Sequence, residues 1–394
     1  MHDALVTETW PPEVNGVALT VRSLQRGLLR RGRRVSVVRP AQHPGQVAAV
    51  RGERGGIARR TRPALPQRRA CGHADRERPG RDFHRACPRR RAAGHGLSSR
   101  AAAARYHGRV NYRHSFHAGN HADVLKHVVL LALCDALVAK PAACFALDTH
   151  AGRGLYQLDD AQATRTGEAL EGIGRLGDGA DAPLPVQRYL DAVDACRRQH
   201  GDSAYPGSPW LLAHALREQD AIACCELHPD EAAALKQAMR GEPRVAVHER
   251  DGYAAMRALL PPRIGDTRYA RGLVLMDPPY ERQLDEFDEV LAALGEGLRR
   301  WPQGSFALWY PIKQRRSLQR FLRRAAALEA KSVLACELLV RDDDSPLRMN
   351  GSGMLLVNPP WRIEQALEPA LVHLRARLGD AAADHSLRWL RTPA

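Results

Sequence analysis

Hydrophobic patterning divides the chain into an irregular N-terminal part and a regular remainder. Residues 46–108 contain hardly any aromatic or β-branched residues and show no periodicity. From residue 111 onward, short apolar runs are separated by stretches with helical apolar spacing, as at Val128, Leu131 and Leu137. Short apolar runs bounded by turn residues are typical of buried strands, and the helical spacing is typical of amphipathic helices. We therefore expect an α/β domain over residues 111–394.

Seven segments of this domain are predicted to be strands, with amphipathic helices between most of them. The last two lie too close together for an intervening helix, which predicts an antiparallel hairpin at one edge of a seven-stranded sheet. The predicted strands are residues 145–148, 221–225, 245–249, 272–276, 305–309, 333–340 and 353–358.

The fourth of these strands ends in Asp277-Pro278-Pro279-Tyr280. Ligands of open α/β sheets bind at the carboxyl ends of the strands, so chemistry is expected here. Asp277 can accept one hydrogen bond from an exocyclic amine, the carbonyl of Pro278 can accept a second, and Tyr280 offers a flat face for an unstacked base. The alternative is an ordinary strand-to-loop turn, since Asp and Pro are common turn residues.

A glycine motif follows the first strand of the domain, where Asp148 begins the pattern D-x-x-x-G-x-G that ends at Gly154. Glycines at such a turn let the backbone approach a ligand closely. The glycine pair alone is a weak signal. Together with the downstream Asp-Pro-Pro-Tyr, it predicts the two-site arrangement of an S-adenosylmethionine-dependent methyltransferase.

Other polar residues follow further strands. Glu226 ends the second strand and suits ribose hydroxyls. Asp251 and Gly252 follow the third and could contact an adenine edge, and Ser208 opens a helix after a rigid turn. Singly, each is equally well interpreted as a surface carboxylate or a helix cap. Their recurrence at strand ends favours a cofactor site.

Four histidines lie within residues 111–127, around a helix start. A metal site is the weaker interpretation, because no matching cysteine or carboxylate pair accompanies them. The eight cysteines of the chain show no C-x-x-C spacing, which argues against structural zinc or a disulfide framework. We expect no metal.

Charge is distributed unevenly. Residues 1–110 contain 24 arginines, no lysine and 7 acidic residues, whereas residues 111–394 contain 35 basic and 37 acidic residues. The basic excess therefore belongs to the N-terminal part and does not by itself indicate nucleic-acid binding by the α/β domain. No apolar stretch approaches 18 residues and no signal peptide is evident, so we expect a cytoplasmic protein without a membrane segment.

The N-terminal part has two sections. Residues 1–45 contain a strand from Ala4, an Asn-Gly-Val loop and a second strand at Val35–Val38, and resemble the truncated start of a family 4 glycosyltransferase. Neither a second domain nor an acidic donor-binding motif follows, so glycosyl transfer is not expected. Residues 46–110 are either a basic RNA-binding arm or a sequence without selected structure, as if GC-rich DNA were read out of frame. We favour the second, a gene-model fusion.

Residues 111–394 closely resemble the 23S rRNA adenine-N6 methyltransferase J family. Seven stretches carry the resemblance in order along the chain, and they begin at Tyr112, Leu147, Tyr205, Glu226, Asp277, Ala307 and Asn358. The resemblance implies a class I S-adenosylmethionine-dependent methyltransferase fold with a small helical insertion over about residues 159–204. It also implies methyl transfer from S-adenosylmethionine to N6 of an adenine in 23S rRNA. Arg153 departs from the family, which has a small residue between the motif glycines.

Roles for individual residues follow from the resemblance and from the chemistry above. Asp277 is implied as the catalytic residue, with Pro278 orienting the amine and Tyr280 stacking on the base. Tyr112 is implied to lie near the substrate base, and Arg113, His114, His117 and Lys126 are our candidates for phosphate contacts. The residues implied to bind the cofactor are His127, His150, Ser208, Glu226, Asp251, Gly252 and Asp277.

Three other functions share part of this pattern. A guanine-N2 rRNA methyltransferase or a DNA adenine-N6 methyltransferase could use the same tetrapeptide, although DNA enzymes usually carry a separate target-recognition domain. A non-catalytic RNA-binding module would not need the cofactor positions. We expect a monomer whose partner is 23S rRNA and which does not bind a membrane.

Overall fold

The computed structural model describes residues 117–160, 167–280, 283–345 and 349–393, together with the backbone of two short strands near the start of the chain. These strands, β1 (His2–Val6) and β2 (Arg34–Val38), pair in parallel and overlap the two strands expected in residues 1–45. The chain divides into two compact units, Met1–Asn111 and Tyr112–Ala394. Within the described residues, no helix is long and apolar enough to cross a membrane.

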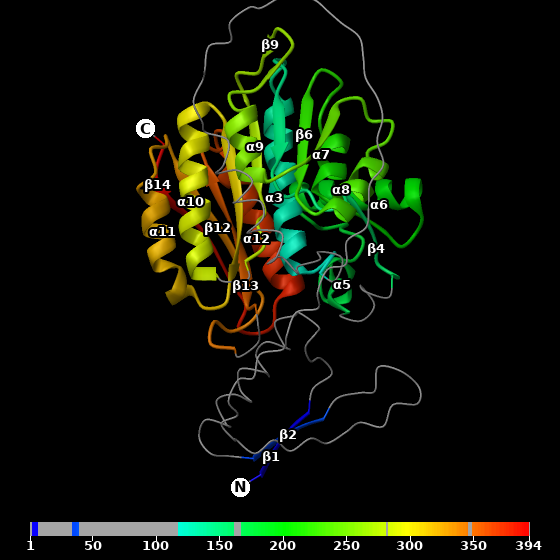
Figure 1. Cartoon of the computed structure of the whole chain (residues 1–394), viewed down its shortest axis with the longest axis vertical. Helices are drawn as coiled ribbons and strands as arrows, with labels where there is room; N and C mark the ends of the chain where they lie inside the picture. The colour runs from blue at the N-terminus through cyan, green and yellow to red at the C-terminus, as the bar shows by residue number, and fades with distance from the viewer. Residues whose placement is uncertain are drawn as a thin grey trace, which may run out of the picture. The chain divides into compact units, whose positions relative to one another are not determined.

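The second unit is built on an eight-stranded sheet with the strand order β14-β12-β13-β11-β10-β3-β6-β7 (Figure 1). The five strands from β11 to β7 in this order pair in parallel, whereas β13 pairs antiparallel with both β11 and β12, and β14 pairs antiparallel with β12. The bounds are β3 (Phe145–Asp148), β6 (Ala221–Glu226), β7 (Val245–Glu249), β10 (Gly272–Met276), β11 (Ser305–Ile312), β12 (Val333–Leu339), β13 (Gly351–Val357) and β14 (Asp384–Arg391).

All seven predicted strands are confirmed, but the prediction of a seven-stranded sheet missed β14. The sequence of β14, Asp-His-Ser-Leu-Arg-Trp-Leu-Arg, contains no apolar run, and its residues are mostly half-buried. The hairpin β12–β13 is antiparallel as expected, yet it does not form the edge, because β14 pairs with the outer side of β12. Edge strands are often polar, which explains why patterning alone overlooked it.

Two layers of helices cover the sheet (Figure 1). Side chains alternate between the two layers along each strand, as in β10, where Leu273 and Leu275 join one core and Val274 and Met276 join the other. The first core includes side chains of α3 (His121–Val138), α6 (Leu184–His200), α7 (Ser208–Ala215), α8 (Pro229–Ala238) and α12 (Ile363–Leu378). The second includes those of α9 (Gly252–Leu259), α10 (Gln283–Arg300) and α11 (Gln319–Ala326).

A helical segment interrupts the connection between β3 and β6. Two short strands, β4 (Leu155–Gln157) and β5 (Ala204–Pro206), pair antiparallel at its base. Between them lie α5 (Glu168–Glu171), the 3-10 helix η2 (Ile173–Arg175) and α6. These elements fall within residues 159–204, where the family resemblance implies an insertion. The remaining short elements are β8 (Arg263–Ile264), β9 (Thr267–Arg268) and the 3-10 helix η3 (Arg315–Leu318).

Candidate active site

The carboxyl ends of four neighbouring parallel strands lie along one edge of the sheet. These strands are β10, β3, β6 and β7. Asp148 of β3 is paired in register with Leu275 of β10, so Asp277 follows two residues beyond this pair. Glu226 of β6 is paired with Glu249 of β7, and Asp251 follows two residues later. The fold therefore brings the predicted carboxylates to one edge, as expected for an open α/β sheet.

Asp277 forms an ion pair that the sequence did not reveal. Lys126 of α3 places its Nζ atom 2.6 Å from Oδ2 of Asp277 and 2.8 Å from Oδ1 of Asp123. The Lys126 side chain is only 5% exposed. Burial alone would lower the pKa of Lys126, but the carboxylates of Asp123 and Asp277 outweigh it and hold the pKa well above its ordinary value. Lys126 is therefore a buried cation that neutralises Asp277 and not the surface cation that we expected to contact phosphate.

The start of α3 fixes this lysine. Asn120 caps the helix by accepting hydrogen bonds from the backbone amides of Ala122 and Asp123, each at 3.0 Å. The backbone amide of Gly119 donates to Oδ2 of Asp123 at 3.0 Å. Since Asp123 and Lys126 are three residues apart on one helix, their pairing could have been predicted from spacing. The contact with Asp277 could not, because it joins positions 151 residues apart.

Tyr280 is anchored at the end of the Asp-Pro-Pro-Tyr motif. Its hydroxyl donates a hydrogen bond to the backbone carbonyl of Trp309 at 2.9 Å. Its ring lies 5.2 Å from that of Phe287 and 5.8 Å from that of Trp309, measured between ring centroids. Burial raises the pKa of Tyr280 well above its ordinary value, so the hydroxyl remains protonated. Pro278, between the carboxylate and this ring, is buried.

The glycine loop after β3 is held from two sides. Asp148 accepts hydrogen bonds from Oγ of Ser208 at 2.7 Å and from the backbone amide of His150 at 3.2 Å. These donors favour the ionised carboxylate, but complete burial outweighs them and raises the pKa of Asp148 to about 7. Sequence reasoning had assigned Asp148 only to the motif. In the structure its carboxyl group joins the glycine loop to the first residue of α7.

Glu226 fastens the other side of the glycine loop. One of its carboxylate oxygens accepts from the backbone amide of Gly152 at 2.9 Å, and the other accepts from that of His228 at 2.7 Å. A carboxylate oxygen has two lone pairs, so each retains acceptor capacity toward a ligand hydroxyl. Arg153 turns away from the loop and donates two hydrogen bonds to Glu231 of α8, at 2.8 and 2.9 Å. This unusual arginine therefore leaves the loop intact.

His150 is neutral and its tautomer can be inferred. The hydroxyl of Thr149 donates to the carbonyl of Leu275 at 3.0 Å and lies 2.7 Å from Nδ1 of His150. Because the hydroxyl proton is already used, Nδ1 must donate and Nε2 is left as the acceptor. Burial lowers the pKa of His150 to about 4, and its ring packs edge-on against Tyr253 at 5.3 Å.

At the third strand end, Asp251 caps α9 by accepting a hydrogen bond from the backbone amide of Ala254 at 2.6 Å. Gly252 lies directly against the backbone carbonyl of Thr149, where a Cβ atom would overlap. Only glycine therefore permits this approach of α9 to the loop after β3.

The remaining predicted residues lie in different surroundings. His127 is buried, and its Nδ1 lies 3.0 Å from the Tyr205 hydroxyl, which in turn is 2.9 Å from that of Tyr189. Nδ1 of His117 lies 3.0 Å from both carboxylate oxygens of Glu168. Tyr112, Arg113 and His114 lie outside the described residues. Among the residues that the structure does describe, no group of three or more His, Cys, Asp or Glu side chains is arranged to hold a metal.

Comparison with known proteins decides the family. The sequence model of the family described as "Ribosomal RNA large subunit methyltransferase D, RlmJ" matches residues 141–391. Ribosomal RNA large subunit methyltransferase J of Escherichia coli (strain K12) is 39% identical over 282 residues, which cover 71% of this chain and 99% of that relative. This chain belongs to the RlmJ family. The protein of the same name from Haemophilus influenzae is 38% identical over 285 residues, with coverage of 71% and 99%.

A solved structure extends the comparison to the fold. Protein LPL1258 from Legionella pneumophila matches 69% of this chain and 98% of its own, with a TM-score of 0.61 and 31% sequence identity. As a member of the RlmJ family with this sheet order, the chain is a class I S-adenosylmethionine-dependent methyltransferase. The expected fold class, enzyme class and cofactor are thereby confirmed.

The strand-end residues of this RlmJ protein fit S-adenosylmethionine. Glu226 has acceptor capacity for the ribose hydroxyls. The N-terminus of α9 packs against the loop after β3 through Gly252, and the carboxylate of Asp251 lies at the same helix end, so an adenine edge would find a carboxylate acceptor there. When bound, the cofactor supplies a methyl group already activated by its sulfonium charge.

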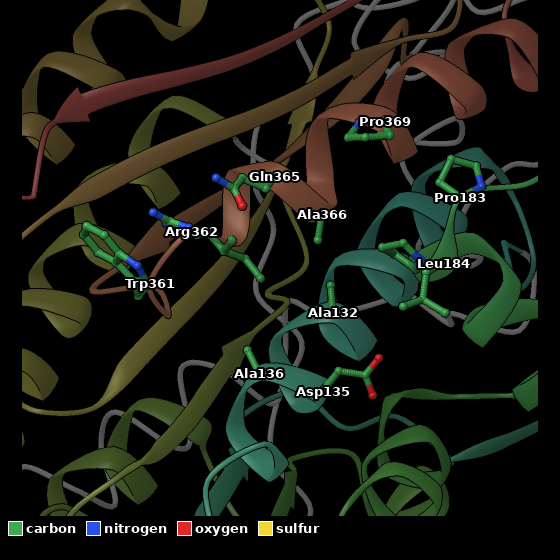
Figure 2. A pocket seen from close by; sticks show the side chains of 12 residues that line it. Ala132, Asp135, Ala136, Pro183, Leu184, Trp361, Arg362, Gln365, Ala366 and Pro369 are labelled. Atoms are coloured by element: carbon green, nitrogen blue, oxygen red, sulfur yellow. The ribbon is translucent and has the colours of Figure 1, made fainter.

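A pocket elsewhere on the RlmJ domain contains none of the predicted site residues (Figure 2). It has a volume of about 440 Å³ and lies between α3, α6 and α12. Its α3 wall includes Asp135, about 13 Å further along the helix axis than Lys126. Its opposite wall includes Trp361, which is 78% exposed and carries the guanidinium of Arg362 5.7 Å from its ring centroid. This pocket is therefore separate from the strand-end site.

Proposed function

We propose that this protein transfers the methyl group of S-adenosylmethionine to N6 of an adenine in 23S ribosomal RNA. The observation that carries the proposal is the Lys126–Asp277 ion pair at the start of the Asp-Pro-Pro-Tyr motif. The names of both curated relatives describe methyltransferases of large-subunit ribosomal RNA, which supports the choice of substrate.

The chemistry of Asp277 suits an amine substrate. A carboxylate paired with a buried lysine at 2.6 Å is held in place as a hydrogen-bond acceptor. Such an acceptor can orient an NH2 group, with the Pro278 carbonyl accepting the second hydrogen. The nitrogen lone pair then points at the electrophile, and the nitrogen loses its extra proton after alkylation. Catalysis is therefore a matter of positioning and electrostatics.

We assign Tyr280 to contact with the target base. Its hydroxyl is engaged with the Trp309 carbonyl, and Phe287 and Trp309 pack against its ring. A ring fixed in this way offers a flat surface at little entropic cost for an adenine drawn out of its stack. We therefore assign Asp277, Pro278 and Tyr280 to orientation of the target base.

The cofactor is assigned to the remaining residues of the strand ends. Glu226 would accept from the ribose hydroxyls, while Asp251 and the Gly252 amide would contact the adenine edge. His150 would present its unprotonated Nε2 as an acceptor. His127, Ser208 and Asp277 complete the proposed set.

Nucleoside mass spectrometry tests the proposal. Unmodified 23S rRNA is incubated with S-adenosylmethionine and the full chain, Asp277→Asn or Asp266→Asn. Asp266 is a matched control, because its fully exposed side chain lies in the β8–β9 turn, before β10 begins. We expect new N6-methyladenosine with the wild type and Asp266→Asn, and none with Asp277→Asn.

Other outcomes would identify the alternatives. Methylated guanosine would show that the substrate is a guanine-N2 position, and activity on duplex DNA alone would indicate a DNA adenine methyltransferase. If Asp277→Asn kept the biological effect of the wild type in cells, the protein would instead be a non-catalytic RNA-binding module. We further propose that the active protein is a monomer, which light scattering of the purified chain would test.

A further inference from the structure

One segment of the methyltransferase domain concentrates positive charge. Residues 313–324 contain one lysine and five arginines and no acidic residue. They run from the end of β11 through η3 into α11. Because the domain from residue 111 onward has slightly more acidic than basic residues, this concentration is a local feature and not a consequence of composition.

The cations of α11 face solvent. Phe321 and Ala325 are buried in the core beneath the helix, whereas Arg320, Arg323 and Arg324 are exposed. The helix is thus amphipathic, with its charged face directed outward. Lys313 and Arg316, which precede the helix, are also exposed. We call the exposed cations Lys313, Arg316, Arg320, Arg323 and Arg324 the η3–α11 surface.

Among the residues that the structure describes, carboxylates pair with only some of these cations. Arg320 and Arg324 both pair with Asp288 of α10. In the part of the chain that the structure describes, Lys313, Arg316 and Arg323 have no carboxylate within ion-pair distance. Arg316 and Arg323 each use only Nε in a hydrogen bond, to the Gln314 side chain and the Gln319 carbonyl respectively.

The boundary of the surface is also charged. Arg315 pairs with Asp384 of β14, and its backbone amide donates to Asp343 at 2.7 Å. Asp343 belongs to an acidic run, residues 342–344, that follows β12. The acidic run would repel a polyanion, whereas the cations of α11 would attract it. The charges therefore favour a path for the polyanion along α11 and away from residues 342–344.

Aromatic contacts join the surface to the active site. Tyr280 packs against Phe287 at 5.2 Å, and Phe287 stacks on Phe321 at 4.4 Å. Phe321 lies on the buried face of α11, opposite the exposed arginines. Strand β11, which leads into the surface, is also the direct neighbour of β10, which leads into Asp277. The surface is therefore linked to the proposed base-binding residues through packed aromatic side chains and through the neighbouring strands β10 and β11.

We propose that the η3–α11 surface binds the phosphates of the RNA that flanks the methylated base. This inference rests on the proposed function, because it requires an RNA substrate whose base lies at Asp277. Arginine is well suited to the task, since its planar guanidinium can bind phosphate in a bidentate manner. Phosphate contacts carry no sequence information, so this surface fixes the position of the RNA and leaves recognition of the base to the site.

The test removes the charges of Lys313, Arg316 and Arg323 in the full chain, as Lys313→Gln/Arg316→Gln/Arg323→Gln. The matched control, Arg240→Gln/Arg268→Gln/Arg299→Gln, also removes three exposed cations. Arg240 and Arg299 lie at the C-terminal ends of α8 and α10, and Arg268 precedes β10, so all three belong to the opposite edge of the sheet. Binding of an unmodified 23S rRNA transcript is measured by filter retention from 50 to 300 mM salt, alongside formation of N6-methyladenosine.

For the η3–α11 variant, we expect the Kd for RNA at 100 mM salt to rise about tenfold, and the slope of log K against log salt to become shallower by about 2 to 3. The Kd for S-adenosylmethionine and kcat at saturating RNA should stay at wild-type values. The control variant should keep the wild-type salt dependence apart from a smaller, non-specific change.

Two results would overturn the inference in distinguishable ways. If the wild type methylates 23S rRNA but the two triple variants bind it equally well, the surface does not contact RNA and the proposed function stands. If the wild type neither binds nor methylates 23S rRNA, the proposed function fails and the inference fails with it.

Discussion

Lys126 of α3 and Asp277 at the end of β10 form a nearly buried ion pair, with 2.6 Å between Nζ and Oδ2. Lys126 also contacts Asp123 at 2.8 Å, so one ammonium group lies between two carboxylates. The proposed acceptor of the substrate amine is thus fixed by a helix that comes from a distant part of the sequence.

Replacement of this lysine should disable the site. In Lys126→Met, Asp123 and Asp277 would lose their common cation, and Asp277 would no longer be fixed. We expect kcat for RNA methylation to fall by about 100-fold, because small displacements of a reacting group have effects of this size. Unfolding free energy should fall by about 3 to 5 kcal/mol, as for other broken buried pairs.

Lys236→Met is the matched control for this variant. Lys236 pairs with Glu249 at 3.2 Å, but both side chains are about half exposed. Its removal should change stability by no more than about 1 kcal/mol and leave kcat unaltered. Wild-type kcat in Lys126→Met would show that Asp277 works without a cationic partner.

Asp148 should make stability depend on pH. Its pKa is about 7 in the folded protein, against about 3.9 for an ordinary aspartate. Folding favours the protonated acid, so the stabilisation is complete below about pH 4 and is lost as the pH rises through about 7. Relative to Asp148→Asn, we expect the wild type to lose up to about 1.4 kcal/mol of unfolding free energy per pH unit in this window. Urea unfolding between pH 4.5 and 7.5 would measure it, and parallel curves for the two proteins would contradict it.

The approach of Gly252 to Thr149 should be required for cofactor binding. In Gly252→Ala, the new Cβ atom would overlap the Thr149 carbonyl and push α9 away from the glycine loop. We expect the Kd for S-adenosylmethionine, measured by calorimetry, to rise at least about tenfold, because a loss of about 1.4 kcal/mol of binding free energy is enough for a tenfold change.

Gly295→Ala provides the comparison. Gly295 lies within α10, and the nearest atom to its added Cβ would be 3.6 Å away, an ordinary contact. This substitution should leave the Kd unchanged and stabilise the helix by about 0.5 to 1 kcal/mol. Equal cofactor affinity in both alanine variants would remove Gly252 from the proposed site.

The second motif, Asn358-Pro359-Pro360-Trp361, should have a structural role. Asn358 adopts a left-handed conformation with φ of 50°, and its side chain accepts from the backbone amide of Lys331 at 2.8 Å and donates to the Pro302 carbonyl at 3.2 Å. In Asn358→Ala, we expect a loss of about 1 to 3 kcal/mol of unfolding free energy from these groups. Methylation below the melting temperature should be unaffected, because Asn358 follows the antiparallel β13 and lies at the opposite edge of the sheet from Asp277. Lost activity in a stably folded variant would assign it a functional role.

The domain boundary can be tested directly. Residues 112–394 form one of the two compact units of the chain. The alignment with the Escherichia coli relative covers 99% of that relative but only 71% of this chain. We expect residues 111–394 to methylate 23S rRNA with a kcat within about twofold of the full chain, a difference of less than about 0.5 kcal/mol in the barrier. Activity confined to the full chain would instead assign residues 1–110 a role in binding RNA.

Much of the fold could be predicted because its strands are apolar and short. All seven predicted strands are present, and the predicted site residues that follow the parallel strands β3, β6, β7 and β10 lie at one edge, as parallel pairing requires. The edge strand β14 was missed because its polar sequence gives no strand signal. Local patterning detects burial, and an edge strand is buried too little to leave that pattern.

The electrostatics of the site were harder to predict. Lysine side chains are usually exposed, and nothing near Lys126 in the sequence except Asp123 indicates a buried ion pair. The contact between Lys126 and Asp277 depends on the order of the strands in the sheet, which brings the end of β10 close to α3. Similarly, the pKa of Asp148 depends on its burial, which no local pattern reports.

The edge strand has a consequence for solubility. All seven residues of β12 are buried, and six of them are apolar. Without β14, this strand would present unpaired backbone groups and an apolar surface at the edge of the sheet, a combination that promotes aggregation. The charged residues of β14, including Asp384, Arg388 and Arg391, replace that edge with one that water solvates. Cleavage before residue 384 should therefore convert the protein into a species that self-associates, even though Asp277 lies several strands away and its own neighbours would remain in place.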